Sequence, residues 1–82
     1  MIGMLLYDDV QGRFIVQELI DHEITDGCKT VELHCGTPLS ICPSKDKWCD
    51  TRIEKNSDDE LYGWYFVGLG KAAPYIGHRV KI

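Results

Sequence analysis

The amino-acid sequence predicts a small all-β domain made of five to six short antiparallel strands. Three observations lead to this prediction. The chain has 82 residues, which is one domain at most. Its hydrophobic content of 44% is enough for a globular core. Short apolar runs alternate with turn residues, and no segment keeps a long helical period.

Residues 1–29 are expected to form an N-terminal hairpin and a loop. The apolar runs 2–7 and 13–19 are the strand candidates, and Gly12 in their connection can adopt the positive φ of a tight hairpin. The range 21–27 is acidic and polar, which indicates a loop.

Two features of this hairpin stay open. Residues 16–24 fit either the end of a strand or a single helical turn, because their apolar positions suit both periods. Residues 1–7 would be the natural edge strand, through which two copies can pair into a homo-oligomer.

Residues 30–82 are expected to form the core of the domain. The alternating pattern predicts strands over 30–35, 39–41, 48–54, 64–69 and 79–82. The run 64–69 is apolar on both faces, which predicts a central strand buried on both sides. The range 70–77 is expected to be irregular, and its glycines, like those before it, are expected in turns.

Four pieces of the second half resemble a known family. They are Leu-His-Cys-Gly at 33–36, Trp48 with Thr-Arg-Ile-Glu at 51–54, Trp-Tyr-Phe-Val-Gly at 64–68, and Gly-His-Arg-Val-Lys-Ile at 77–82. In this order they resemble domain-of-unknown-function family 5348, small domains of Gram-positive bacteria and their mobile elements. The resemblance implies no established activity.

The same order of elements is similar to SH3-like barrels, in which a glycine precedes a short terminal strand. This likeness implies a small SH3-like barrel over residues 30–82. The paired tryptophans that line the proline-binding groove of signalling SH3 domains are missing here, so the likeness does not imply a proline-rich ligand.

Charge and leader sequence limit the function classes. The net charge is −4, which argues against generic nucleic-acid binding. Residues 1–44 are acidic, whereas residues 45–82 carry seven basic side chains against six acidic ones. The N-terminal apolar stretch is too short and wrongly flanked for a signal peptide or a membrane span, so we expect a cytoplasmic protein that binds no membrane.

The cysteines predict neither a disulfide framework nor a metal site. Cys28, Cys35, Cys42 and Cys49 recur every seven residues, without the short ligand spacing of zinc sites. In a cytoplasmic protein we expect reduced thiols, with Cys35 and Cys49 packed as small core residues.

No catalytic constellation or cofactor motif is apparent. His34 and Cys35 are neighbours on a predicted strand, so their side chains point to opposite faces. The stretch 68–71, Gly-Leu-Gly-Lys, is half a phosphate-binding loop without its helix, and turn glycines explain it better. We therefore expect a protein without cofactor that is not an enzyme.

A binding module is the leading functional hypothesis, with a protein as the partner. Strand parity places Trp48 and Arg52 on one polar face, and Tyr62 and Tyr65 complete the candidate surface. An alternative interpretation of Trp48 is that it covers the mouth of the barrel or packs under the loop after Asn56.

The alternative hypothesis is a nucleic-acid-binding accessory protein of a phage or mobile element. Its candidate surface is the basic side chains of the second half, namely Lys55, Lys71, His78, Arg79 and Lys81.

Overall fold

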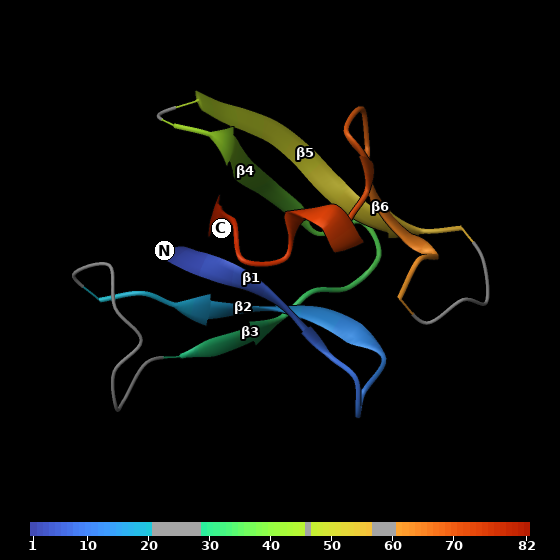
Figure 1. The fold of residues 1–82 in the computed structure, drawn as a ribbon. Helices are drawn as coiled ribbons and strands as arrows, with labels where there is room; N and C mark the ends of the chain where they lie inside the picture. The colour runs from blue at the N-terminus through green and yellow to red at the C-terminus, as the bar shows by residue number, and fades with distance from the viewer. Residues whose placement is uncertain (21–28, 46, 57–60) are drawn as a thin grey trace.

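The computed structural model describes residues 1–20, 29–45, 47–56 and 61–82 (Figure 1). Within these ranges the protein is all-β, with eight strands and one 3-10 turn. The elements are β1 (Ile2–Asp8), β2 (Arg13–Glu18), β3 (Thr30–Glu32), β4 (Pro38–Ser44), β5 (Lys47–Lys55), β6 (Trp64–Phe66), β7 (Gly70–Lys71), the 3-10 turn η1 (Ala73–Tyr75) and β8 (Arg79–Lys81). The all-β class is confirmed. The described strands outnumber the five to six expected, and one of them, β7, lies in the range 70–77 that the sequence predicts as irregular.

All eight strands pair in one sheet with the order β3-β2-β1-β8-β4-β5-β6-β7. Figure 1 shows that this sheet doubles back on itself, with β1, β2 and β3 in one layer and β4, β5 and β6 in the facing layer. The last strand, β8, pairs antiparallel with β1 on one side and β4 on the other. The two ends of the chain therefore meet, and the Met1 amino group donates a 2.8 Å hydrogen bond to the carbonyl of Ile82.

The hydrophobic core lies between the two layers. Strand alternation selects the residues that enter it: Phe14 and Val16 of β2 are fully buried, as is Ile41 of β4. The cluster takes side chains from the first hairpin and from the rest of the chain. Its members are Leu5, Phe14, Val16, Leu33, Leu39, Ile41, Ile53, Trp64, Phe66, Ala72 and Val80.

The connection between β1 and β2 is the hairpin that the sequence predicts. The carboxylate of Asp8 accepts backbone hydrogen bonds from Val10 at 3.0 Å and Gln11 at 3.2 Å, which closes the turn. Gly12 has a φ of 69°, which glycine adopts without steric cost.

The expectation that residues 1–7 form the edge of the sheet is wrong. Strand β1 is hydrogen-bonded on both sides, to β2 and to β8. The partner on the second side comes from the opposite end of the chain, so the local pattern gives no sign of it. Among the described strands, the edges are β3 and β7.

The predicted strand over 64–69 is too long. Strand β6 ends at Phe66, and the chain then turns through Gly68, whose φ of 81° does not continue a strand. The strand is central, between β5 and β7, but Tyr65 is only half-buried and Val67 is 39% exposed. The interpretation of Gly68 as a turn residue is confirmed, whereas Gly70, although its φ is 88°, begins strand β7.

The helical turn lies elsewhere than the one considered at 16–24. Val16 to Glu18 belong to β2, and the remainder of that range from residue 21 lies outside the described residues, as does the expected loop 21–27. The observed turn is η1, inside the range 70–77 that the sequence predicts as irregular. Pro74 suits its start, because its fixed φ matches a helical turn.

The prediction for the two core cysteines is half wrong. Strand β3 ends at Glu32, and Cys35 then forms an exposed turn with Gly36, whose φ is 87°. The predicted alternation therefore stops at Leu33, the last residue of that run to be buried. Cys49 is half-buried and packs against the core. Cys35, Cys42 and Cys49 are free thiols, and Cys28 lies outside the described residues.

Candidate functional site

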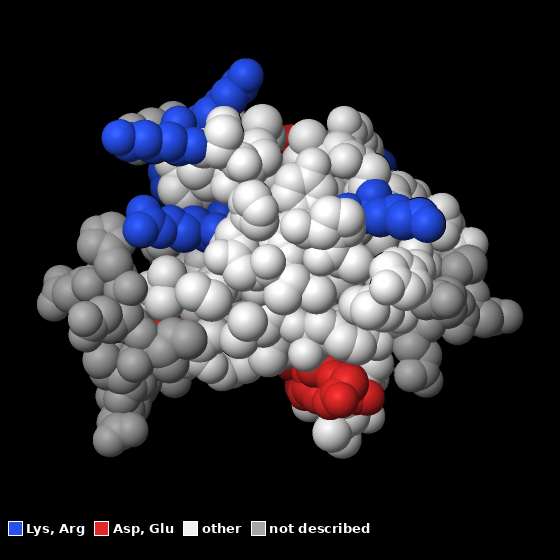
Figure 2. All heavy atoms as spheres, viewed as in Figure 1, with Lys and Arg blue, Asp and Glu red and all other residues white. Residues whose placement is uncertain are grey.

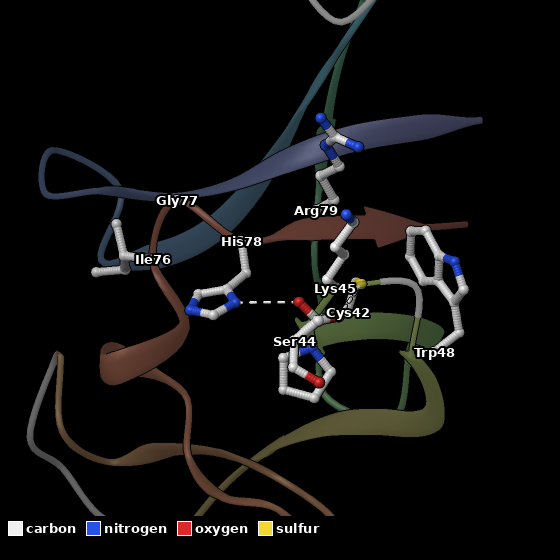
Figure 3. Close-up of a pocket in the computed structure, with 9 residues that line it drawn as sticks. Cys42, Ser44, Lys45, Trp48, Ile76, Gly77, His78 and Arg79 are labelled. Atoms are coloured by element: carbon white, nitrogen blue, oxygen red, sulfur yellow. Dashed lines mark hydrogen bonds between the residues drawn. The ribbon is translucent and has the colours of Figure 1, made fainter.

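A pocket of about 650 Å³ opens between the β4–β5 hairpin and the segment that leads into β8 (Figure 3). Polar and charged side chains line much of it, together with one indole. The lining residues are Cys42, Pro43, Ser44, Lys45, Trp48, Ile76, Gly77, His78 and Arg79. We call this feature the Trp48 pocket.

Strand register explains why these side chains meet. Cys42 of β4 lies directly opposite Arg79 of β8. The residues just before Cys42 and just after Arg79, Ile41 and Val80, are buried in the core. Because side chains alternate along a strand, Cys42 and Arg79 point away from the core, and the outer face of the sheet becomes the floor of the pocket.

His78 fixes one wall of the pocket. Its Nδ1 lies 3.0 Å from the carbonyl oxygen of Cys42, the contact drawn as a dashed line in Figure 3. A carbonyl only accepts hydrogen bonds, so Nδ1 carries the proton and donates it. The ring also packs edge-on against Tyr75, with 5.5 Å between ring centroids. These two contacts tie β4 to the segment between η1 and β8.

The indole of Trp48 forms another wall and carries a cation against its ring. The ammonium of Lys81 lies 4.2 Å from the ring centroid, within the range of a cation–π contact. Trp48 is half-buried and Lys81 is exposed. The indole is therefore held on the surface of the sheet and is not part of the core.

The pocket has a positive electrostatic character. Lys45 and Arg79 are among its described lining residues, and none of those described residues is an acid. In Figure 2 the largest group of Lys and Arg atoms lies on the side of the β4–β5 hairpin, whereas most acidic atoms in this view lie over the β1–β2 hairpin. Asp46, between Lys45 and Lys47 in the sequence, lies outside the described residues.

The nearest described carboxylate along β5 is that of Asp50. It accepts a 2.5 Å hydrogen bond from the hydroxyl of Ser40, and it lines a second, shallower hollow of about 360 Å³ that also includes Lys81. Among the described residues, this acid therefore borders the neighbouring hollow and does not line the Trp48 pocket.

Comparison with known proteins places the chain in a family. A family model described as a domain of unknown function, DUF5348, matches residues 3–82. The chain belongs to the DUF5348 family. The match includes the first hairpin, beyond the four pieces of the second half. A crystal structure of a protein from Ruminococcus gnavus is similar over 100% of both chains, with 34% identity and a TM-score of 0.67. A search of curated proteins found no match.

In this family member, the structure separates the residues expected to form a protein-binding surface. Trp48 contacts Lys81, while Arg52 is exposed further along β5. Tyr65 lies opposite Glu54, six residues or roughly 20 Å along the strand from Trp48. Tyr62 is 57% exposed. Trp48, Arg52 and Tyr65 thus share one side of the sheet without forming one patch.

The residues expected to form a nucleic-acid surface are also divided. His78, Arg79 and Lys81 come together at or beside the Trp48 pocket. Lys71 lies 5.8 Å from the ring of Tyr62, and Lys55 lies 5.4 Å from the ring of Trp64. The last two lysines therefore belong to the β5–β6–β7 end of the sheet.

Sequence reasoning missed Lys45 and Cys42 as parts of the site. The signal that was available is the sequence around the β4–β5 turn, where Lys45 and Lys47 directly precede Trp48. Their meeting with Arg79 depends on the pairing of β4 with β8, which no local pattern indicates.

Within the described ranges, no three His, Cys, Asp or Glu side chains gather closely enough to hold a metal ion. In the same ranges, no helix is both long and apolar enough to cross a membrane. The imidazole of His34 is hydrogen-bonded to Arg13, whose Nη1 donates to His34 Nδ1 at 2.7 Å.

Proposed function

We propose that this protein is a nucleic-acid-binding module that contacts the phosphate backbone through the Trp48 pocket. The observation that carries the proposal is the convergence of Lys45 and Arg79 in one pocket beside Lys81 and an indole. Phosphate groups bind in hollows where cationic hydrogen-bond donors gather and where no carboxylate repels the phosphate. The proposed role is binding, without catalysis.

The net charge of −4 is compatible with this proposal because the charge is unevenly distributed. Residues 1–44 carry seven acidic side chains against two basic ones, whereas residues 45–82 carry seven basic side chains against six acidic ones. Both basic residues of the Trp48 pocket, Lys45 and Arg79, come from the second range. A local gathering of cations attracts a polyanion even where the net charge of the chain is negative.

Arg79 is positioned to be the main phosphate ligand. It is exposed, and it lies on a strand that is paired on both sides, so its backbone is fixed. Neither Arg79 nor Lys45 forms an ion pair with a carboxylate of the described residues. A guanidinium that is not paired with a carboxylate can donate hydrogen bonds to phosphate oxygens without first breaking an ion pair.

The test is fluorescence anisotropy of a labelled single-stranded oligonucleotide with purified protein at low salt. We expect Arg79→Ala and Lys45→Ala to weaken binding, and Arg52→Ala, an exposed arginine outside both hollows, to leave it unchanged. With about three phosphates neutralised by Lys45, Arg79 and Lys81, the plot of log affinity against log salt should have a slope of about −2.

Two results would contradict the proposal. One is the absence of binding to single- or double-stranded oligonucleotides at low salt. The other is binding that Arg52→Ala weakens as much as Arg79→Ala does, because the pocket would then not be the site of contact.

A second candidate function is binding of a protein partner at the β5–β6–β7 end of the sheet. The observation that favours it is the side-by-side placement of Tyr65 and Lys71 on paired strands, with exposed Tyr62 beneath the Lys71 ammonium. Tyrosine is enriched at protein interfaces relative to the rest of the surface. An affinity pull-down with Tyr62→Ala and Trp48→Ala variants, repeated after nuclease treatment, distinguishes the two surfaces.

We also propose that the doubled sheet is an SH3-like barrel. Two features support this: the 3-10 turn η1 comes directly before the terminal strand, and that strand pairs with the first one. The mobile-element context that the family resemblance implies fits an accessory role on nucleic acid.

A further inference from the structure

Two hollows lie on either side of the contact between Trp48 and Lys81. Trp48 lines the larger pocket together with Arg79, whereas Lys81 lines the shallower hollow together with Ser40 and Asp50. The indole and its cation therefore stand between two open spaces on the outer face of β4, β5 and β8. A surface of this shape suits an extended chain that runs from one hollow to the next.

The two cations of β8 are spaced for consecutive phosphates. Arg79 and Lys81 are alternate residues of one strand, so their side chains leave the same face about 6.6–6.8 Å apart. Neighbouring phosphates in an extended single strand have a comparable separation. Lys45 supplies a further charge at the Arg79 end.

Among the described lining residues of the two hollows, Trp48 is the one Trp, Tyr or Phe, and its indole is half-buried. Aromatic rings beside a cationic track stack on unpaired bases, and this stacking tolerates any base because every base has a π-face. A base inside a duplex already stacks on both of its neighbours, so its face is not available to the ring.

We propose that the Trp48 pocket binds single-stranded nucleic acid. One unpaired base stacks on the side of the indole that lines this pocket, which Lys81 does not line, and the flanking phosphates contact Arg79 and Lys81. This rests on the proposed function and adds the strandedness of the ligand and the role of the ring. Asp50 borders the second hollow, so the second phosphate contacts Lys81 on the side away from that carboxylate.

The experiment titrates wild-type protein with three probes of equal length and charge per strand: an oligothymidylate, an abasic strand and a duplex. Tryptophan emission and anisotropy are both recorded. The second tryptophan, Trp64, is buried at 5% exposure and serves as the internal reference. We expect the oligothymidylate to quench the emission, and the abasic strand to bind about 5- to 150-fold more weakly, the range of one base–aromatic stack.

Two variants assign the effect to the ring. Trp48→Leu should bind the oligothymidylate as weakly as wild-type protein binds the abasic strand, and Trp48→Tyr should recover much of the affinity. Circular dichroism checks that both variants fold. If either does not, the comparison of thymidylate and abasic strands on wild-type protein still decides the question.

The outcomes separate this inference from the function on which it rests. Equal affinity for the abasic strand and the oligothymidylate, or tighter binding of the duplex, would overturn the stacking proposal while leaving phosphate binding in place. No binding of any probe at low salt would overturn both.

Discussion

The ammonium group of Lys81 lies 4.2 Å from the centroid of the Trp48 ring. The contact joins β8, the last strand along the chain, to β5, and β4 lies between these two strands in the sheet. The indole is therefore covered by Lys81, a residue near the end of the chain. The sequence around Trp48 does not indicate this contact.

Replacing Lys81 with alanine should expose the indole. We expect acrylamide to quench tryptophan emission more strongly in Lys81→Ala than in wild-type protein, because the ring loses its cover. The loss of stability should stay near 0.5–1 kcal/mol, the value of a cation–π contact at an exposed site. Lys71→Ala is the control, since Lys71 lies over Tyr62 and not over a tryptophan. Identical quenching of the two variants would show that the contact does not persist in solution.

Adjacent substitutions at the end of β6 should differ sharply in their effect on stability. Phe66 is fully buried and Val67 is 39% exposed. We expect Phe66→Ala to lower the free energy of unfolding by about 3–5 kcal/mol, the usual cost of such a cavity. Val67→Ala should change it by less than about 0.5 kcal/mol. Urea unfolding monitored by circular dichroism measures both, and a similar loss for each would disprove the placement of the turn after Phe66.

Gly3 should tolerate no side chain. It is buried in β1, and a Cβ built there would lie 2.6 Å from the carbonyl oxygen of Gln17 on β2. Backbone cannot yield as a flexible side chain does, so Gly3→Ala should lower the free energy of unfolding by about 1–3 kcal/mol. The control is Val10→Ala, at a position 91% exposed in the same hairpin. A Gly3→Ala variant as stable as the control would show that β1 and β2 pair differently.

The cysteines should differ in reactivity toward alkylating reagents. Cys35 is exposed in a turn, whereas Cys49 is half-buried against the core. Exposure controls the access of a reagent to the thiolate, so Cys35 should be alkylated before Cys49 in native protein. Peptide mass spectrometry after brief iodoacetamide treatment gives the order. Faster modification of Cys49 would indicate that Cys35 is buried and would contradict its placement in an exposed turn.

Local sequence patterns were enough to predict where several strands lie. The runs expected over 13–19, 39–41 and 48–54 are found within or close to β2, β4 and β5. Phe14, Val16, Ile41 and Ile53 are the side chains of these strands that are fully buried in the core. The errors occur where backbone conformation ends an alternating run. Gly68 adopts positive φ inside the run expected over 64–69, and β6 ends before it at Phe66. Strand β3 likewise ends at Glu32, before the end expected at residue 35, and the turn at Cys35 and Gly36 follows.

The site was harder to predict because it depends on long-range pairing. Lys45, Trp48 and Arg79 come together only because β8 pairs with β4. From the sequence alone, the basic residues of the second half are expected to share one surface. The structure instead places Arg79 in the Trp48 pocket and Lys81 beside it over the indole, and leaves Lys71 at the far end of the sheet.

The most direct test of the account is a titration of ¹⁵N-labelled protein with a short oligothymidylate, followed by two-dimensional NMR. The account predicts that the largest shifts of backbone amides fall on residues 42–45, 48 and 78–81, together with the indole N–H of Trp48. Amides of β6 and β7 should stay in place. Shifts concentrated at β6 and β7, or no shifts at saturating oligonucleotide and low salt, would contradict the claim that the Trp48 pocket binds nucleic acid.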